Sequence, residues 1–141
     1  MQLDAVDLRD FYGRPLGSTV RRLLTHRIRA RWRDVHREVV IGVGFATPYL
    51  GIFRGEAHRL GAFMPVTQGA IVWPYGAPCH TVLADEDQLP LPDNSVDKVL
   101  IVHGLEAAER VEPFLREIWR VMKPEGRLLA IVPNRSGMCN A

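Results

Sequence analysis

The sequence predicts an α/β fold in which a doubly wound, mostly parallel sheet of about five strands is flanked by helices. Short, continuous apolar runs of the kind found in strands buried on both faces recur along the chain. Between these runs lie segments whose apolar residues are spaced by three and four, which is the period of an amphipathic helix. With 141 residues, the chain has the length of one domain.

The composition narrows the class of protein. With 47% hydrophobic and 24% charged residues, it excludes a disordered polyelectrolyte, a collagen-like repeat and a coiled coil. No apolar stretch approaches the roughly 18 residues of a membrane span, and the acidic start (Asp4, Asp7, Asp10) is unlike a signal peptide, so we expect a cytoplasmic location. Cys79 and Cys139 form no C-x-x-C motif, which favours reduced thiols and predicts no metal site.

The first 37 residues are expected to form a helical, arginine-rich segment packed on a core built by residues 38–141. Residues 1–40 carry nine Arg against five acids, a net charge of 9 − 5 = +4. After a loop-like opening (Gly13, Pro15, Gly17), an amphipathic helix is predicted across Arg21 to Arg37. Its basic face either binds nucleic-acid phosphates or an acidic partner, or is a solvated surface. We favour the solvated surface and do not expect nucleic acid as the partner.

A strand, a glycine turn and a helix are predicted next. The apolar run from Glu38 to Ala46 ends in glycines, and Thr47-Pro48 follows as a helix start with Thr as the N-cap. The helix would extend from Tyr49 to about Ala57, weakened by two glycines at about 1 kcal/mol each. Two further strands are expected at 60–64 and 70–73, punctuated by prolines.

The second half alternates more clearly between strands and a helix. Residues 81–84 and 96–102 are predicted strands, and the polar, proline-marked segment 85–94 between them is a predicted loop. A helix is predicted over 106–122, stopped by Pro124 and Gly126, and a last strand over 128–132.

The glycine turn is the segment that most strongly suggests a functional site. Gly42 and Gly44 let the backbone approach a ligand, and the helix that follows offers free amides to a carboxylate or phosphate. In a doubly wound sheet, such a turn lies at the edge where ligands bind. The alternative is a tight turn that serves packing alone, and the turn itself does not decide between the two.

Three segments behind this turn resemble class I S-adenosylmethionine-dependent methyltransferases. They are A-D-E-D-Q-L-P-L-P-D-N-S-V-D at 84–97, K-V-L-I-V-H-G-L-E at 98–106, and F-L-R-E-I-W-R-V-M-K-P-E-G-R-L-L-A-I-V-P-N at 114–134. The resemblance covers about residues 38–134 and is specific in the combination and order of the motifs. It implies a Rossmann-like fold and S-adenosylmethionine as the cofactor, bound by a small methyltransferase domain.

The resemblance also implies which residues bind the cofactor. The candidates are Gly42, Val43, Gly44 and Ala46 at the turn, Asp85 with its neighbour Glu86 in the loop, and His103 and Gly104 after the strand predicted at 96–102. Asp85 would accept a hydrogen bond from the adenine amino group, and otherwise would cap a turn. His103 and Gly104 would lie near the sulfonium or the acceptor. The catalytic residue stays unknown: His103 is a weak candidate, because methyl transfer often needs only alignment of the reactants.

Several positions depart from the family pattern. Val40 stands where an acid usually precedes the turn, and Ala46 replaces the third glycine. The candidate second strand (59–65) lacks the carboxylate that binds the ribose hydroxyls, for which Gln68 offers one acceptor. Glu125 replaces a glycine of the usual Lys-Pro-Gly-Gly turn.

The family fold has seven strands, and this sequence ends after about five. We therefore expect either a fragment of a longer protein, truncated at the C-terminus, or a sheet edge covered by a partner or a second copy. Two other functions compete with methyl transfer: an inactive methyltransferase-like scaffold acting by contact, and a nicotinamide dinucleotide enzyme, which the Asp85 loop disfavours. The acceptor stays unknown, and the Trp73-Pro-Tyr-Gly76 turn either faces it or packs on the sheet.

Overall fold

The computed structural model describes residues 5–65, 81–105 and 108–132, which form one parallel sheet covered by helices. The strand order is β3-β2-β1-β4-β5, and all four pairings are parallel. The strands are β1 (Val39–Gly44), β2 (Arg59–Pro65), β3 (Thr81–Ala84), β4 (Val96–Val102) and β5 (Met122–Ile131). The predicted Rossmann-like α/β class is confirmed, as are the strands predicted at 38–46, 60–64, 81–84 and 96–102.

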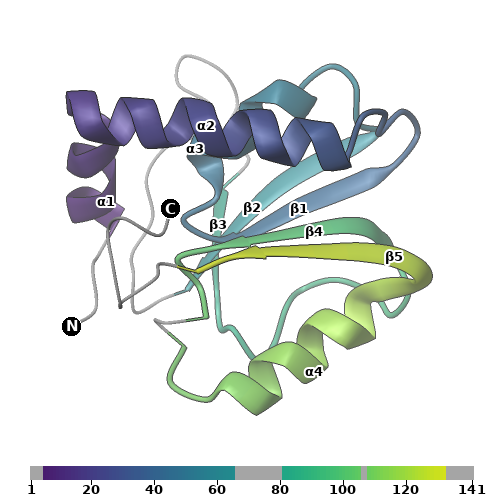
Figure 1. The fold of residues 1–141 in the computed structure, drawn as a ribbon. Helices are drawn as coiled ribbons and strands as arrows, with labels where there is room; N and C mark the ends of the chain where they lie inside the picture. The colour runs from purple at the N-terminus through teal and green to yellow at the C-terminus, as the bar shows by residue number, and fades with distance from the viewer. Residues whose placement is uncertain (1–4, 66–80, 106–107, 133–141) are drawn as a thin grey trace.

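The helices lie on both faces of this sheet and beyond one of its edges (Figure 1). They are α1 (Ala5–Tyr12), α2 (Pro15–Arg31), α3 (Thr47–Leu50) with a 3₁₀ turn at Gly51–Phe53, and α4 (Val111–Val121). Figure 1 shows α2 along one face, α4 on the opposite face, and α1 beyond the carboxyl ends of the strands. None of the described helices has the length and apolar character needed to cross a membrane.

The core is divided by the sheet into two layers. On the α2 side, Ile28 and Trp32 pack with Val40, Leu100 and neighbouring buried residues. On the α4 side, Phe114 and Ile118 pack with Ile41, Val99 and Ile101. The alternation of side chains along a strand explains this division, because consecutive residues such as Val40 and Ile41 point to opposite faces.

The N-terminal segment corrects one prediction. The loop-like opening is confined to the turn at Gly13 and Arg14, because Ala5–Tyr12 and Pro15–Arg31 are both helical. Pro15 lies at the start of α2, where its missing N–H costs no hydrogen bond. Gly17 lies inside α2. A Cβ at this position would lie 2.0 Å from the Phe11 carbonyl oxygen, so the lack of a side chain lets α2 pack against the end of α1.

The helix after the glycine turn is shorter than predicted. Thr47 is not the N-cap: that position belongs to Ala46, no side chain caps the helix, and Thr47 is buried as its first residue. The α-helical part ends at Leu50, and Gly51–Phe53 continues as a 3₁₀ turn. The two glycines explain the short helix, because Gly51 lowers helix propensity and Gly55 adopts a positive φ of 81°.

The helix-to-strand boundary near residue 122 also differs from the prediction. Helix α4 begins at Val111 rather than 106, and β5 begins directly at Met122 rather than at 128. Pro124 and Gly126 therefore lie within β5, at a shift in register against β4 between Val96 and Lys98. The predicted strand 70–73, Gln68 and the Trp73–Gly76 turn lie outside the described residues.

Candidate functional site

The candidate site residues lie at one edge of the sheet. Because every strand is parallel, the carboxyl ends of β1, β3 and β4 meet at this edge, which is where open α/β sheets bind ligands. Phe45 follows β1, Asp85 follows β3, and His103 follows β4. The structure thus brings the glycine turn, the acidic loop and the His103 segment together, as the motifs imply.

Two glycines allow β1 and β4 to approach each other closely as they leave the sheet. Gly44 has a φ of 89°, and a Cβ on it would lie 2.3 Å from the Val102 carbonyl oxygen and 3.0 Å from the Gly104 nitrogen. The Phe45 N–H donates to that same Val102 oxygen at 2.7 Å. Gly44, Phe45 and Gly104 are all buried, so the two glycines let the backbones of β1 and β4 pack closely at this point.

The other residues of the turn serve packing. A Cβ on Gly42 would lie 2.6 Å from the Ala46 Cβ and 2.7 Å from Leu50 Cδ1, so Gly42 lets α3 lie against β1. Val43 and Ala46 are themselves buried in the core. Packing therefore accounts for both Gly42 and Gly44, and binding of a ligand at the turn stays a prediction.

A chain of hydrogen bonds ties α1 to His103. His103 Nε2 lies 2.9 Å from the Tyr12 hydroxyl, and the Tyr49 hydroxyl donates to Tyr12 at 2.7 Å. Burial raises the pKa of the Tyr49 phenol above its ordinary value, and the hydrogen bond with Tyr12 adds to the shift. His103 itself has a φ of 54°, a strained backbone for a residue with a side chain.

Sequence reasoning missed Tyr12, which belongs to this site through α1. Its ring stacks on Phe45 with a centroid separation of 6.0 Å. The signal was present in the helical spacing of Ala5, Leu8 and Tyr12, but the glycines and proline that follow suggested a loop.

Helix α1 also covers the end of β2. Ala5 and Leu8 form a buried cluster with Phe45 and Met64. Met64, fully buried, thus occupies the part of β2 where the resemblance would place a ribose-binding carboxylate. Within the described residues, β2 offers no acid at this position.

The first two of the three acids at 85–87, in the loop after β3, have different environments. Asp85 is exposed, and its carboxylate has no hydrogen-bond partner among the described residues, while its backbone oxygen accepts from Gln88 N–H at 3.0 Å. Glu86 instead accepts from the Glu109 N–H at 2.9 Å and so links this loop to the segment before α4. Asp85 is the acid available to a ligand.

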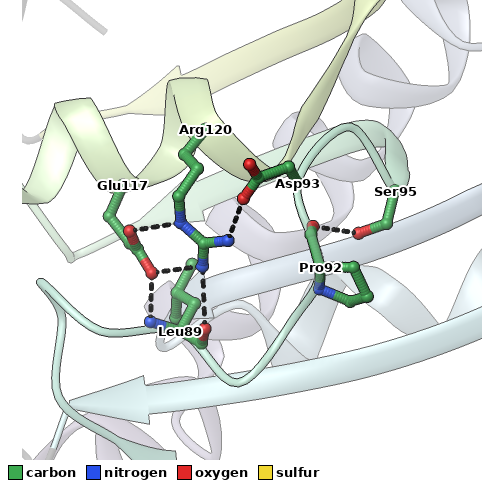
Figure 2. Close-up of polar contacts among 6 residues, drawn as sticks. All are labelled: Leu89, Pro92, Asp93, Ser95, Glu117 and Arg120. Carbon is green, nitrogen blue, oxygen red and sulfur yellow. Dashed lines mark hydrogen bonds and ion pairs between the residues drawn. The ribbon is translucent and has the colours of Figure 1, made fainter.

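Helix α4 fixes the rest of this loop through Arg120 and Glu117 (Figure 2). Arg120 donates to Glu117 at 2.6 and 2.8 Å, to Asp93 at 2.6 Å and to the Leu89 carbonyl at 3.0 Å. Glu117 also accepts from the Leu89 N–H at 2.6 Å. Arg120 and then the Leu89 N–H hold the pKa of Glu117 below its ordinary value.

A family model described as "Methyltransferase domain" matches residues 38–130. The chain belongs to this family. The match begins just before β1 and includes nearly all of β5, so it spans the whole sheet together with α3 and α4. Methyltransferase domains of this class use S-adenosylmethionine, and the class I assignment made from the three motifs is confirmed.

Individual relatives agree with the methyltransferase assignment. The ubiquinone/menaquinone biosynthesis C-methyltransferase UbiE of Azotobacter vinelandii is 48% identical over 50 residues, which cover 36% of this chain and 20% of that protein. A putative S-adenosyl-L-methionine-dependent methyltransferase of Methanococcus maripaludis has the same fold with a TM-score of 0.64 at 14% identity, covering 92% of this chain and 64% of that one. A SAM-dependent methyltransferase of Aquifex aeolicus aligns with a TM-score of 0.56 at 23% identity, over 75% of this chain and 62% of that one. This methyltransferase domain spans about a fifth of the curated relative.

The carboxyl edge of this methyltransferase domain can be compared with the two ends of S-adenosylmethionine. At the methionine end, Gly44 and Gly104 are buried and bring the backbones of β1 and β4 together beneath the turn. The exposed carboxylate of Asp85 is an acceptor suited to an exocyclic amine, as the adenine end requires. Between them, the end of β2 is apolar at Met64, so the ribose would find its partners elsewhere.

Proposed function

We propose that this methyltransferase domain binds S-adenosylmethionine across the carboxyl edge of β3, β1 and β4. The supporting observation is that Asp85, whose carboxylate has no hydrogen-bond partner among the described residues, and the glycine turn after β1 lie at the same edge of the sheet. Two strand spacings, about 10 Å, separate β3 from β1, which suits a ligand with a nucleoside at one end and an amino acid at the other. Gly42, Val43, Gly44, Ala46, Glu86 and His103 would line or support this site.

When bound, the cofactor supplies an electrophilic methyl group on a sulfonium. The domain's own contribution is to bind and orient: Asp85 recognises the adenine amine, and the turn after β1, where buried glycines bring the backbones of β1 and β4 together, receives the methionine end. His103 would act as a base only toward an acceptor that loses a proton. In the structure its Nε2 is engaged by Tyr12, so Tyr12 sets the orientation of the ring.

Binding of S-adenosylhomocysteine, measured by calorimetry, tests the cofactor site. Replacing Asp85 by Ala removes the adenine acceptor, and we expect the dissociation constant to rise about tenfold or more. Asp87→Ala is the matched control, since Asp87 is an exposed acid of the same loop, and it should bind like the unchanged protein. Equal losses in both variants, or no saturable binding by the unchanged protein, would contradict the proposal.

Catalysis is a separate question from binding, because the chain spans about a fifth of its curated relative. The competing function is a scaffold that does not transfer methyl groups, and the apolar residues Val40 and Met64 at positions usually acidic are in its favour. Transfer of label from methyl-labelled S-adenosylmethionine to any acceptor in a cell extract would reject the scaffold. The acceptor itself is not assigned by the described residues, and the cytoplasmic location stays a prediction.

We also propose that the β5 edge is covered in the working protein. Among the described strands, β5 pairs with β4 alone, and Leu128 on it is exposed. Val111, Leu115 and Trp119 form an exposed apolar stripe on the neighbouring α4. A second copy or another protein segment would remove this surface from water. Sedimentation velocity at increasing concentration tests the second copy, and a monomer throughout would exclude it.

A further inference from the structure

A basic pocket lies away from the carboxyl ends of the strands. It is found where Lys98, near the amino end of β4, and Arg127, in the middle of β5, meet the end of α2. Its volume is about 400 Å³, and its lining includes the cations Arg31, Arg33, Lys98 and Arg127, the carboxylate of Asp34 and the ring of Trp32. Lys98 lies four residues before Val102 in β4, so the pocket is about 13 Å from the proposed cofactor edge. It is a different site.

The two strand cations of this pocket are direct neighbours. Lys98 and Arg127 are paired in the register of β4 and β5, and Lys98 is also in register with Val40, whose side chain is on the α2 face. Like charges directly opposite each other on adjacent strands destabilise a sheet. Lys98 is compensated by Glu38, whose carboxylate lies 3.0 Å from its ammonium group. No such partner lies beside Arg127 in the described part of the chain.

The pocket carries an excess of positive charge. Its four lining cations and one lining carboxylate give a net charge of 4 − 1 = +3, or +2 when Glu38 behind Lys98 is included. Arg31, Arg33 and Arg127 make no ion pair with any described residue, and Asp34 is already engaged by His36 at 2.7 Å. Three exposed arginines therefore line one concavity whose single lining carboxylate, Asp34, is paired with His36.

We propose that this pocket binds a small organic phosphate. Guanidinium groups match the oxygens of a phosphate through paired, charge-assisted hydrogen bonds, and several arginines around one pocket suit a mono- or diphosphate. The volume is within the range of small-ligand sites, and the largely buried Trp32 supplies an apolar wall for the rest of the molecule. A concave site of this kind favours a compact ligand over an extended nucleic acid, which needs a row of cations along the surface.

Titration with inorganic pyrophosphate at low ionic strength tests the site, with binding followed by calorimetry and by amide chemical shifts. The unchanged protein should bind saturably, with shifts around residues 31–34 and 127–129. Arg127→Gln and Arg33→Gln should each raise the dissociation constant about tenfold, since each removes charge-assisted hydrogen bonds. Arg22→Gln is the matched control: it removes the same charge from an exposed position of α2 outside the pocket and should leave binding unchanged.

Further arms of the experiment separate the sources of phosphate. Binding to phosphatidylglycerol vesicles without binding to pyrophosphate would overturn the proposal in favour of a lipid surface. Binding to a short DNA duplex that weakens equally in Arg22→Gln and Arg127→Gln would overturn it in favour of a diffuse basic face. Unchanged affinity for S-adenosylhomocysteine in Arg127→Gln supports two independent sites, and it also shows that the variant is folded.

Discussion

Tyr49 and Tyr12 show how single side chains connect the edge of the sheet to the N-terminal helix. The Tyr49 hydroxyl is buried and donates to Tyr12, which in turn lies beside His103. Replacing Tyr12 by Phe keeps the stacking on Phe45 but leaves the Tyr49 hydroxyl without this acceptor. Replacing Tyr49 by Phe removes the buried hydroxyl itself. The two variants therefore differ in whether a buried polar group loses its partner.

We expect Tyr12→Phe to lower the free energy of unfolding by about 1–3 kcal/mol, and Tyr49→Phe to lower it by less. The double variant should cost less than the sum of the two, because the residues share a hydrogen bond. Urea denaturation measures all three. Additive effects would mean that the hydroxyl chain does not form.

The raised pKa of Tyr49 also predicts a dependence on pH. The folded state keeps the phenolic proton above the ordinary tyrosine pKa of about 10, where the unfolded state loses it. Stability from this group is thus complete below about pH 10 and falls as the pH rises further. The free energy of unfolding should decline less steeply above that pH in Tyr49→Phe, and identical slopes would contradict the assignment.

Glu117 performs a similar connecting role for the loop that carries Asp85. In Glu117→Gln one carboxylate oxygen becomes an amide N–H₂, so Arg120 loses one of its two acceptors, and the Leu89 N–H loses its acceptor as well if the replaced oxygen is Oε2. We expect a loss of about 1–3 kcal/mol in unfolding free energy. Glu112→Gln is the control, because Glu112 makes an exposed pair with Arg116 on the same helix and should change stability little.

The same carboxylate predicts a loss of stability in acid. Its folded pKa is lowered, so its contribution is present above the unfolded value of about 4.3 and is lost as the pH falls through the lower folded value. The unfolding free energy of Glu117→Gln should therefore depend less on pH in this range. If the unfolding free energy of the variant depended on pH as it does in the unchanged protein, Glu117 would not be a cause of the loss of stability in acid.

At the level of elements, the glycines around β1 and α3 are not equivalent. Gly44→Ala would place a Cβ against the Val102 carbonyl at a positive φ, and we expect it to lower stability by more than about 2 kcal/mol. Gly51 has a φ of −57°, and no atom lies within 4 Å of the place that a Cβ would take, so Gly51→Ala should raise stability by up to about 1 kcal/mol. Thermal unfolding distinguishes them, and equal effects of the same sign would contradict this difference.

The strands were predictable where they are short apolar runs, as in β1 and the second half of β4, because a strand buried on both faces has little choice of residue. The start of β5 was not predicted, because it lies in the polar segment around Lys123 and Glu125. The helices were less predictable, because their bounds depend on tertiary contacts. Pro15 and Gly17 suggest a loop locally, yet Gly17 is required where α2 meets Phe11. The positions of Gly44 and Asp85 at the carboxyl edge were predictable because each is set by the strand beside it, whereas their role in cofactor binding stays a prediction. The partner of His103 was not predictable, because Tyr12 lies 91 residues earlier in the sequence.

At the scale of the whole molecule, the distribution of apolar surface is uneven. Trp119 is 78% exposed on α4, whereas Trp32 on the other face of the sheet is 6% exposed. These two tryptophans should therefore report opposite sides of the sheet and respond differently to a soluble quencher.

We expect Trp119→Phe to remove a red-shifted fluorescence component that acrylamide quenches readily, and Trp32→Phe to leave that component in place. The comparison is made first in dilute solution, where the α4 face of a single chain is open to water. Protection of Trp119 that increases with protein concentration would indicate that a second copy covers the β5 edge. Protection at every concentration would contradict the exposed stripe itself.

The contact between Tyr12 and His103 has a consequence for the order of folding. Helix α1 is synthesised before the sheet, but its docking surface requires the ends of β1, β2 and β4, the last of which is synthesised some 90 residues later. Contacts that span so much sequence close large loops and form late. The contacts of α1 should therefore be absent from the transition state for folding, and substitutions at Leu8 should speed unfolding while leaving the folding rate nearly unchanged.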